Sequence, residues 1–253
     1  GWCLFYQVSA ADLPLYINVG LKLYKLGEEA IIPLERFSLT GPVFKSFRSN
    51  ARKLEREGFE FAVIPVLGVP EYLDSLETIS SEWLSTKNTH EKGFSVGFFS
   101  RDYIRKFPLA VIRKEGRIYG FANIWTAARK SEVSVDIMRY CKDSPNGVMD
   151  FLFTNLMFWG KQQGFKRFNL GMAPLSGLSN RPLAPLWNRA GALIFSYGEY
   201  FYNFEGLHRY KDKFSPVWEP KYLACPGALT LPRALTSIAS LISEGSDGLL
   251  IKP

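Results

Sequence analysis

The chain has 253 residues, 47% of them hydrophobic and 22% charged, a globular composition that excludes a disordered or collagen-like polymer. Its formal net charge of +7 favours an anionic partner, either a nucleic acid or a lipid surface. No apolar run approaches the roughly 18 residues that a membrane-spanning helix needs. Cys3, Cys141 and Cys225 are widely separated, which argues against a disulfide framework or a metal site and favours a reducing compartment.

The N-terminal quarter is expected to contain two strands and two helices. We predict them at residues 2–8 (strand), 11–26 (helix, ending at Gly27), 42–57 (helix, ending at Gly58) and 59–66 (strand). Pro65, Gly68 and Pro70 then punctuate the chain and predict a domain boundary. Because the chain begins without Met inside an expected strand, it is interpreted as a fragment of a longer protein.

The helix expected over residues 42–57 carries an apolar stripe and a basic stripe, each at three- and four-residue spacing. Its basic residues are Lys45, Arg48, Arg52, Lys53 and Arg56. Basic side chains on one helix face suit nucleic-acid phosphates, whose binding needs no base recognition. We therefore predict a nucleic-acid contact here, with a solvated helix face beside the core as the alternative.

The rest of the chain is expected to mix helices and strands. Helices are predicted at residues 71–83, 146–163, 183–190, 201–213 and 230–243, and strands at 109–113, 116–125, 132–138, 168–171, 192–196 and 222–224. Three consecutive strands followed by a long helix indicate an antiparallel meander with a helical crossover. This order resembles that of GNAT-type acyltransferases and predicts an α/β fold.

GNAT-type enzymes usually bind acetyl-CoA through an R/Q-x-x-G-x-G/A turn, whose backbone amides hold the pyrophosphate. The nearest candidates, at residues 161–166 and 188–191, lack the required residues. We therefore expect an acyl donor other than CoA, and no cofactor.

Several separated motifs, in a fixed order, resemble one family. They lie at residues 135–150, 168–177 and 202–218, with support from residues 26–30 and 46–53. They resemble the cytosolic catalytic domain of the aminoacyl-phosphatidylglycerol synthases, the multiple peptide resistance factor (MprF) or phosphatidylglycerol lysyltransferase group. The resemblance runs from about residue 4 to residue 225.

The resemblance implies tandem GNAT-like acyltransferase folds related to the Fem peptidyl transferases. Residues 1–68 would be the C-terminal part of an incomplete first unit, residues 69–226 a complete catalytic unit, and residues 227–253 an amphipathic helix and tail. It also implies an N-terminal transmembrane domain outside this chain. The chain would then act at the cytoplasmic face of the bacterial cell membrane.

The implied reaction moves a lysyl or alanyl group from aminoacyl-tRNA to the glycerol hydroxyl of phosphatidylglycerol. Aminoacyl-tRNA and phosphatidylglycerol are thus the implied partners, and the basic helix would contact the tRNA backbone. The product has its negative charge cancelled or reversed, which gives resistance to cationic antimicrobial peptides.

Such an ester exchange needs an activated hydroxyl, a stabilised oxyanion and recognition of the free α-ammonium. A carboxylate serves the first or third need, and a cation serves the second. Asp136 and Arg139, expected near a strand end, match the D-x-x-R element that the resemblance places in the active site. We assign Asp136 to the ammonium or to proton handling and Arg139 to the ester or phosphate. An Asp–Arg pair that only fixes the strand end is the alternative.

Further candidates come from two later segments. Asp150 is either a supporting carboxylate or a simple acid of the first helical turn. Asn169, Met172 and Ser176 lie where GNAT folds open their substrate cleft, or in a turn without chemistry.

Residues 205–213 mix charged and aromatic side chains and resemble the family's G-L-x-x-Y-K-x-K-F signature. Tyr210 and Lys211 are predicted as catalytic, and Glu205, Arg209 and Lys213 as substrate-binding. The two lysines would hold the tRNA 3′ end or the lipid phosphate, while Tyr210 stacks or donates a hydrogen bond.

A covalent enzyme intermediate is not expected, because His90 lies in a polar loop and His208 has no evident Ser or Cys partner. Three alternative functions stay open. These are a Fem-like transferase acting on a peptide, a non-catalytic RNA-binding module, and an acetyl-CoA transferase that lacks the usual CoA turn.

Overall fold

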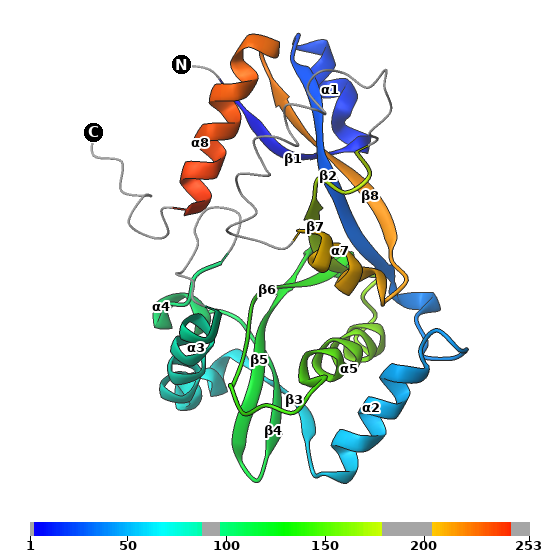
Figure 1. The fold of residues 1–253 in the computed structure, drawn as a ribbon, viewed down its shortest axis with the longest axis vertical. Coiled ribbons are helices and arrows are strands. Elements are labelled where there is room, and N and C mark those ends of the chain that lie inside the picture. The colour runs from blue at the N-terminus through cyan, green and yellow to red at the C-terminus, as the bar shows by residue number, and fades with distance from the viewer. Residues whose placement is uncertain (1–2, 88–96, 179–203, 244–253) are drawn as a thin grey trace. The chain divides into compact units, whose positions relative to one another are not determined.

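The computed structural model describes residues 3–87, 97–178 and 204–243 (Figure 1). The chain divides into two compact units that alternate along the sequence. One comprises Gly1–Ile32 and Leu170–Ala239, and the other comprises Pro33–Asn169 and Ser240–Pro253. These units differ from the contiguous division predicted at residues 68 and 226, because the N-terminal strands pair with a strand from the C-terminal part of the chain. The helix at 183–190 and the strand at 192–196 fall outside the described residues.

The strands of the first unit have the order β1-β8-β2-β7. They are β1 (Phe5–Ser9), β2 (Lys22–Pro33), β8 (Val217–Cys225) and the second half of β7 (Arg167–Pro174). Both β1 and β2 pair with β8 in antiparallel fashion. The helices described in this unit are α1 (Leu13–Asn18), α7 (Phe204–Asp212) and, up to Ala239, α8 (Leu231–Ser243).

The helix predicted over residues 11–26 is wrong in its second half. The helix α1 ends at Asn18, Gly20 has a φ of +83°, and β2 begins at Lys22. Pairing with β8 overrides the local helical spacing. Gly27 does not end a helix: a Cβ at this position would overlap the carbonyl oxygen of Ala173, so glycine permits the close approach of two backbones.

The second unit contains the predicted meander. Its strands follow the order β7-β6-β5-β4-β3, with β6 and β7 parallel and the other pairs antiparallel. They are β3 (Glu60–Ile64), β4 (Leu109–Lys114), β5 (Arg117–Thr126), β6 (Glu132–Tyr140) and the first half of β7. The long helix α5 (Val148–Gln162) connects the parallel strands, as the 3.6-residue periodicity predicted.

Helices lie on both faces of these strands. In Figure 1, α3 (Leu73–Lys87) and α4 (Arg101–Ile104) lie on one face, and α2 (Lys45–Arg56) and α5 on the other. The core between α3, α4 and the strands includes Leu76, Ile104, Phe121 and Ile137, which are all fully buried. Among the described residues, no helix is long and apolar enough to cross a bilayer.

Candidate active site

Asp136 lies at a bulge in β6. On either side, Ala122 pairs with Met138 and Ile124 with Val135, so that two residues of β6 lie opposite the single residue Asn123 of β5. The Oδ1 atom of Asn123 accepts hydrogen bonds from the backbone nitrogens of Asp136, at 3.2 Å, and Ile137, at 2.7 Å. A bulge redirects the side chains of a strand, and bulges are frequent beside active sites.

Within the described part of the chain, the carboxylate of Asp136 accepts one hydrogen bond at each oxygen. The backbone nitrogen of Gly97 donates to Oδ1 at 2.8 Å, and the hydroxyl of Tyr103 donates to Oδ2. Burial raises the pKa of the Tyr103 hydroxyl, and the bond to Asp136 raises it further, so the hydroxyl keeps its proton at neutral pH. A Cβ at Gly97 would overlap the carboxylate. The surroundings of Asp136 therefore fix the direction in which its charge points.

Arg139 is buried within β6, three residues beyond Asp136. Its guanidinium lies 4.2 Å from the ring centroid of Trp83 on α3, and its Nη1 donates to the carbonyl of Met138 at 3.1 Å. Asp136 therefore lies inside the strand, whereas Arg139 is its penultimate residue, near the strand end that the sequence predicted. Both follow Ser134, the last residue of β6 that pairs with β7. A buried guanidinium on an aromatic face is held in a fixed orientation and suits a planar anion.

Lys211 is a buried cation of the first unit. It lies on α7, only 6% of it is exposed, and its Nζ donates to the carbonyl of Met172 in β7 at 2.8 Å. Burial lowers the pKa of Lys211 to about 8, and the carboxylate of Glu29 counteracts this only in part. Glu29 is itself paired with Lys221 at 2.8 Å. Near neutral pH, Lys211 is therefore a cation with an ammonium group shielded from water.

The remaining residues of the 205–213 segment are more exposed than Lys211. Glu205 and Arg209 form an exposed ion pair one helical turn apart, at 3.6 Å, an interaction that contributes little to stability. The Nζ of Lys213 lies 4.8 Å from the ring centroid of Tyr210, whose ring packs edge-on against Phe214. Within the segment predicted as one functional cluster, only the lysine at position 211 is a buried cation.

Three of the other predicted site residues make structural contacts. Asn169 donates to Glu132 at 3.2 Å, and Ser176 donates to the carbonyl of Ala173 at 2.8 Å within a turn. Met172 contributes its carbonyl to Lys211. Asp150 lies in the first turn of α5 and is partly exposed. Ser176 therefore lies in a turn, as the alternative interpretation of this segment predicted.

The basic face of α2 is narrower than the sequence suggested. Lys45, Arg52 and Arg56 are exposed and line an open hollow. Arg48 also lines this hollow but is only partly exposed, and its guanidinium donates to the carbonyls of Leu39 and Gly41, the latter at 2.7 Å, and so holds the preceding turn. Lys53 lies 3.9 Å from Glu57 on the same helix. We define the basic face of α2 as the three residues 45, 52 and 56.

Sequence reasoning missed the residues that surround Asp136, namely Gly97, Tyr103 and Asn123. Asn123 left a detectable signal, because it is a polar residue within an apolar strand. Tyr103 lies four residues after Phe99 and resembles an ordinary core aromatic residue, and Gly97 resembles an ordinary loop glycine. Gly97 and Tyr103 lie more than 30 residues before Asp136 in the sequence, and only the fold brings them close to it.

The chain matches known proteins over nearly its whole length. A family model for the C-terminal domain of phosphatidylglycerol lysyltransferase matches residues 1–225. The phosphatidylglycerol lysyltransferase of Bacillus subtilis (strain 168) is 42% identical over 243 residues, 95% of this chain and 28% of the relative. That of Staphylococcus aureus (strain COL) is 34% identical over 240 residues, 94% of this chain and 28% of the relative. The chain thus spans 28% of the length of these curated relatives.

Solved structures support the same relationship. The C-terminal domain of a putative lysylphosphatidylglycerol synthetase from Agrobacterium fabrum has a TM-score of 0.85 and 40% identity, and covers 97% of this chain and 74% of that chain. L-PGS from Bacillus licheniformis has a TM-score of 0.84 and 42% identity, and covers 95% and 73%.

FemX, with a TM-score of 0.60 and 9% identity over 92% of this chain and 74% of that chain, shares the fold alone. These neighbours confirm the GNAT-like α/β fold predicted from the order of elements. The family that the sequence motifs predicted is confirmed as well: this chain belongs to the phosphatidylglycerol lysyltransferase C-terminal domain family.

Proposed function

We propose that this chain transfers an aminoacyl group, lysyl or alanyl, from aminoacyl-tRNA to the glycerol hydroxyl of phosphatidylglycerol. The observation that carries the proposal is the carboxylate of Asp136, aimed by Gly97 and Tyr103 within a chain whose relatives are named phosphatidylglycerol lysyltransferase. A directed carboxylate provides what an aminoacyl substrate needs, an anionic partner for its α-ammonium.

The proposed reaction exchanges one ester for another without a covalent enzyme intermediate. The lipid hydroxyl oxygen attacks the carbonyl carbon of the aminoacyl ester, and a C–O bond to the lipid forms. The C–O bond to the 3′-terminal ribose of the tRNA breaks, and the proton lost by the lipid hydroxyl is balanced by one gained on the ribose oxygen. Asp136 binds the α-ammonium, and the buried guanidinium of Arg139 stabilises negative charge on the ester or on a phosphate.

The lysines at positions 211 and 213 provide the second part of the proposal. The Nζ of Lys211 has three N–H bonds and gives one to Met172, so further donors exist for an anionic oxygen. Lys213 follows the last residue of α7, is exposed, and has its Nζ 4.8 Å from the ring centroid of Tyr210. We assign Lys211 and Lys213 to the phosphate of the lipid or of the tRNA 3′ end.

A product assay tests the proposal directly. Lys-tRNA and Ala-tRNA, each labelled in the amino acid, are mixed separately with the chain and phosphatidylglycerol vesicles, and the lipid fraction is analysed. We expect labelled aminoacyl-phosphatidylglycerol from at least one donor. Vesicles of phosphatidic acid provide the matched control, because this anionic lipid has no glycerol headgroup and hence no acceptor hydroxyl. Label transferred to a peptide, or tRNA binding without any product, would reject the proposal in favour of a Fem-like transferase or an RNA-binding module.

The basic face of α2 is assigned to the tRNA backbone. Changing Lys45, Arg52 and Arg56 together to Glu should raise the KM for aminoacyl-tRNA at least about tenfold, because three cations that can neutralise phosphates become anions. The slope of log KM against log salt should become shallower by about one for each phosphate that the helix no longer neutralises. Initial rates at several salt concentrations measure both quantities.

A control with the same change in net charge uses three exposed lysines outside α2, Lys22, Lys142 and Lys166, changed to Glu. We expect this control to leave the salt slope near that of the wild type. Equal slopes in the two triple variants would remove the basic face of α2 from the tRNA-binding surface.

A further inference from the structure

The hydroxyl that reaches Asp136 belongs to a short, well-anchored helix. Tyr103 lies in the single turn α4, whose N-cap residue Ser100 accepts a hydrogen bond from the Tyr103 backbone nitrogen at 3.2 Å. Ile104, the next residue, is fully buried in the core beside α3. The backbone that carries the hydroxyl is therefore fixed by both a cap and a core contact.

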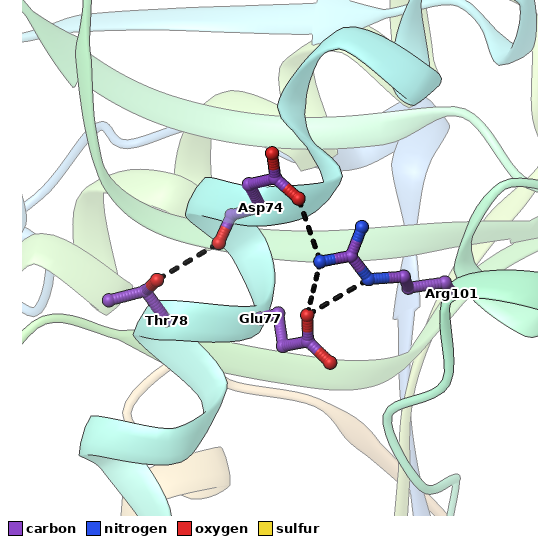
Figure 2. A network of polar contacts seen from close by, with 4 residues as sticks. All are labelled: Asp74, Glu77, Thr78 and Arg101. Carbon is purple, nitrogen blue, oxygen red and sulfur yellow. Dashed lines mark hydrogen bonds and ion pairs between the residues drawn. The ribbon is translucent and has the colours of Figure 1, made fainter.

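An ion network on the outer side connects α4 to α3. Arg101 pairs with Asp74 at 2.7 Å, and its Nε donates to Glu77 at 2.9 Å, as Figure 2 shows. Exposed pairs of this kind contribute little to overall stability. Because Arg101 lies two residues before Tyr103, the network restrains the orientation of α4 on α3.

The ring of Tyr103 is also held by aromatic neighbours. It lies parallel to Phe98, with ring centroids 6.3 Å apart, and tilted against Phe107 at 5.0 Å. Phe107 in turn stacks on Trp125 of β5 at 5.1 Å. Ring neighbours on two sides restrict rotation about the side-chain bonds, so the hydroxyl direction is determined before any substrate binds.

We infer that Tyr103 is a positioning residue, which fixes the Asp136 carboxylate together with the Gly97 amide so that its free acceptor sites point toward the α-ammonium of the aminoacyl substrate. This inference rests on the proposed function. A carboxylate has about four acceptor sites, and the two described donors occupy one on each oxygen. Donors at both oxygens prevent the carboxylate from rotating. Tyr103 holds its proton tightly, so it acts as a donor and not as a proton-transfer group.

A double-mutant cycle tests this role. Tyr103→Phe removes the hydroxyl but keeps the ring and its stacking partners. We expect it to lower kcat/KM for aminoacyl-tRNA about tenfold in the wild-type background, the usual size of a charge-assisted hydrogen bond. In the Asp136→Asn background it should lower the residual rate less than twofold, because the group that it positions is already changed. If the hydroxyl only stabilised the fold, Tyr103→Phe would lower the rate by the same factor in both backgrounds.

Tyr72→Phe is the matched control. Tyr72 packs against the same core, and the described residues include no hydrogen-bond partner for its hydroxyl. We expect this variant to keep wild-type kcat/KM, and both phenylalanine variants to melt within a few degrees of the wild type. Coupling of less than twofold between Tyr103 and Asp136 would overturn the positioning role.

A second variant changes Gly97, which donates to the other oxygen of the Asp136 carboxylate. Gly97 has no left-handed φ, so Gly97→Ala adds a methyl group without backbone strain, and this group would displace the carboxylate. We expect a loss of kcat/KM of at least about tenfold. Wild-type kcat/KM in a folded Gly97→Ala variant would show that the carboxylate need not be fixed.

Calorimetric binding of lysinamide separates this inference from the proposed function. The probe presents an α-ammonium without tRNA or lipid. We expect its affinity to show the same coupling as kcat/KM, so that Tyr103→Phe weakens binding in the wild-type background but not in the Asp136→Asn background. A wild-type chain that makes lipid product without coupling in either measurement overturns the positioning role alone. A chain that makes no lipid product overturns the proposed function, and the lysinamide cycle then decides the positioning role. A wild-type chain that fails to bind lysinamide overturns the ammonium contact and the positioning role with it.

Discussion

Asp136→Asn is expected to reduce aminoacyl transfer about 100- to 1000-fold while leaving the chain folded. The amide keeps the volume of the side chain but removes the charge that we assign to the substrate ammonium. It also places an NH₂ group where both oxygens now accept, from Gly97 and from Tyr103, so one of these donors would face another donor. Initial rates with labelled aminoacyl-tRNA and phosphatidylglycerol vesicles measure the loss.

Asp143→Asn provides the matched control for this change. Asp143 lies just after β6 and forms an exposed ion pair with Arg117 at 2.9 Å. Its loss should change the transfer rate less than twofold and the unfolding free energy by less than about 1 kcal/mol. If the variant at position 136 retained wild-type transfer, the assignment of the D-x-x-R element would fail.

Lys211→Met is expected to have the second-largest effect, a loss of transfer of about 100-fold. Methionine matches the length of the buried stem but cannot donate to Met172 or to a phosphate. Lys25→Met is the control, because Lys25 also donates to a backbone carbonyl, that of Gly177 at 3.0 Å, and lies in the same unit. Similar losses in both variants would indicate that Lys211 has only a structural role.

The pKa of Lys211 also predicts how stability depends on pH. The folded chain releases this proton near pH 8, whereas the unfolded chain keeps it until about pH 10.5. Between these values Lys211 binds more protons in the unfolded state, so its contribution to the unfolding free energy rises with pH. The shift corresponds to about 3 kcal/mol, all of which is gained between pH 8 and pH 10.5.

Denaturant unfolding of the wild type and Lys211→Met at several pH values isolates this contribution. The difference between the two unfolding free energies should change in favour of the wild type as the pH rises from 8 to 10.5, and should be constant below pH 7. A difference that stays constant over the whole range would show that the Lys211 ammonium is not buried as described.

Local patterns predicted several elements well. The apolar spacing of residues 42–57 and 146–163 located α2 and α5, and the turn at residues 114–116 separated β4 from β5. The helix predicted over residues 11–26 failed where β2 begins, because nine residues of β2 pair with β8 almost 200 positions away. Long-range strand pairing of that kind overrides local propensity. It leaves no local pattern in a single sequence from which it could be predicted.

The roles of single residues depended even more on distant contacts. Arg48 shares the basic stripe of α2, yet its guanidinium holds the turn at residues 39–41. Lys211 and Lys213 are two residues apart in one motif, yet Lys211 is buried and Lys213 is exposed. Helical spacing determines which residues share a face, but burial depends on which strands cover that face.

The sequence by itself determined the family, the fold class and the identity of Asp136 and Arg139 as site candidates, because motifs and periodicity are local properties of the chain. The tertiary structure alone decided what those residues contact. Gly97 and Tyr103 reach Asp136 from the segment at residues 97–104 and Asn123 from β5, and no spacing rule connects them with Asp136. Hydrogen bonds and burial act through space, so the environment that directs the carboxylate exists only in the folded chain.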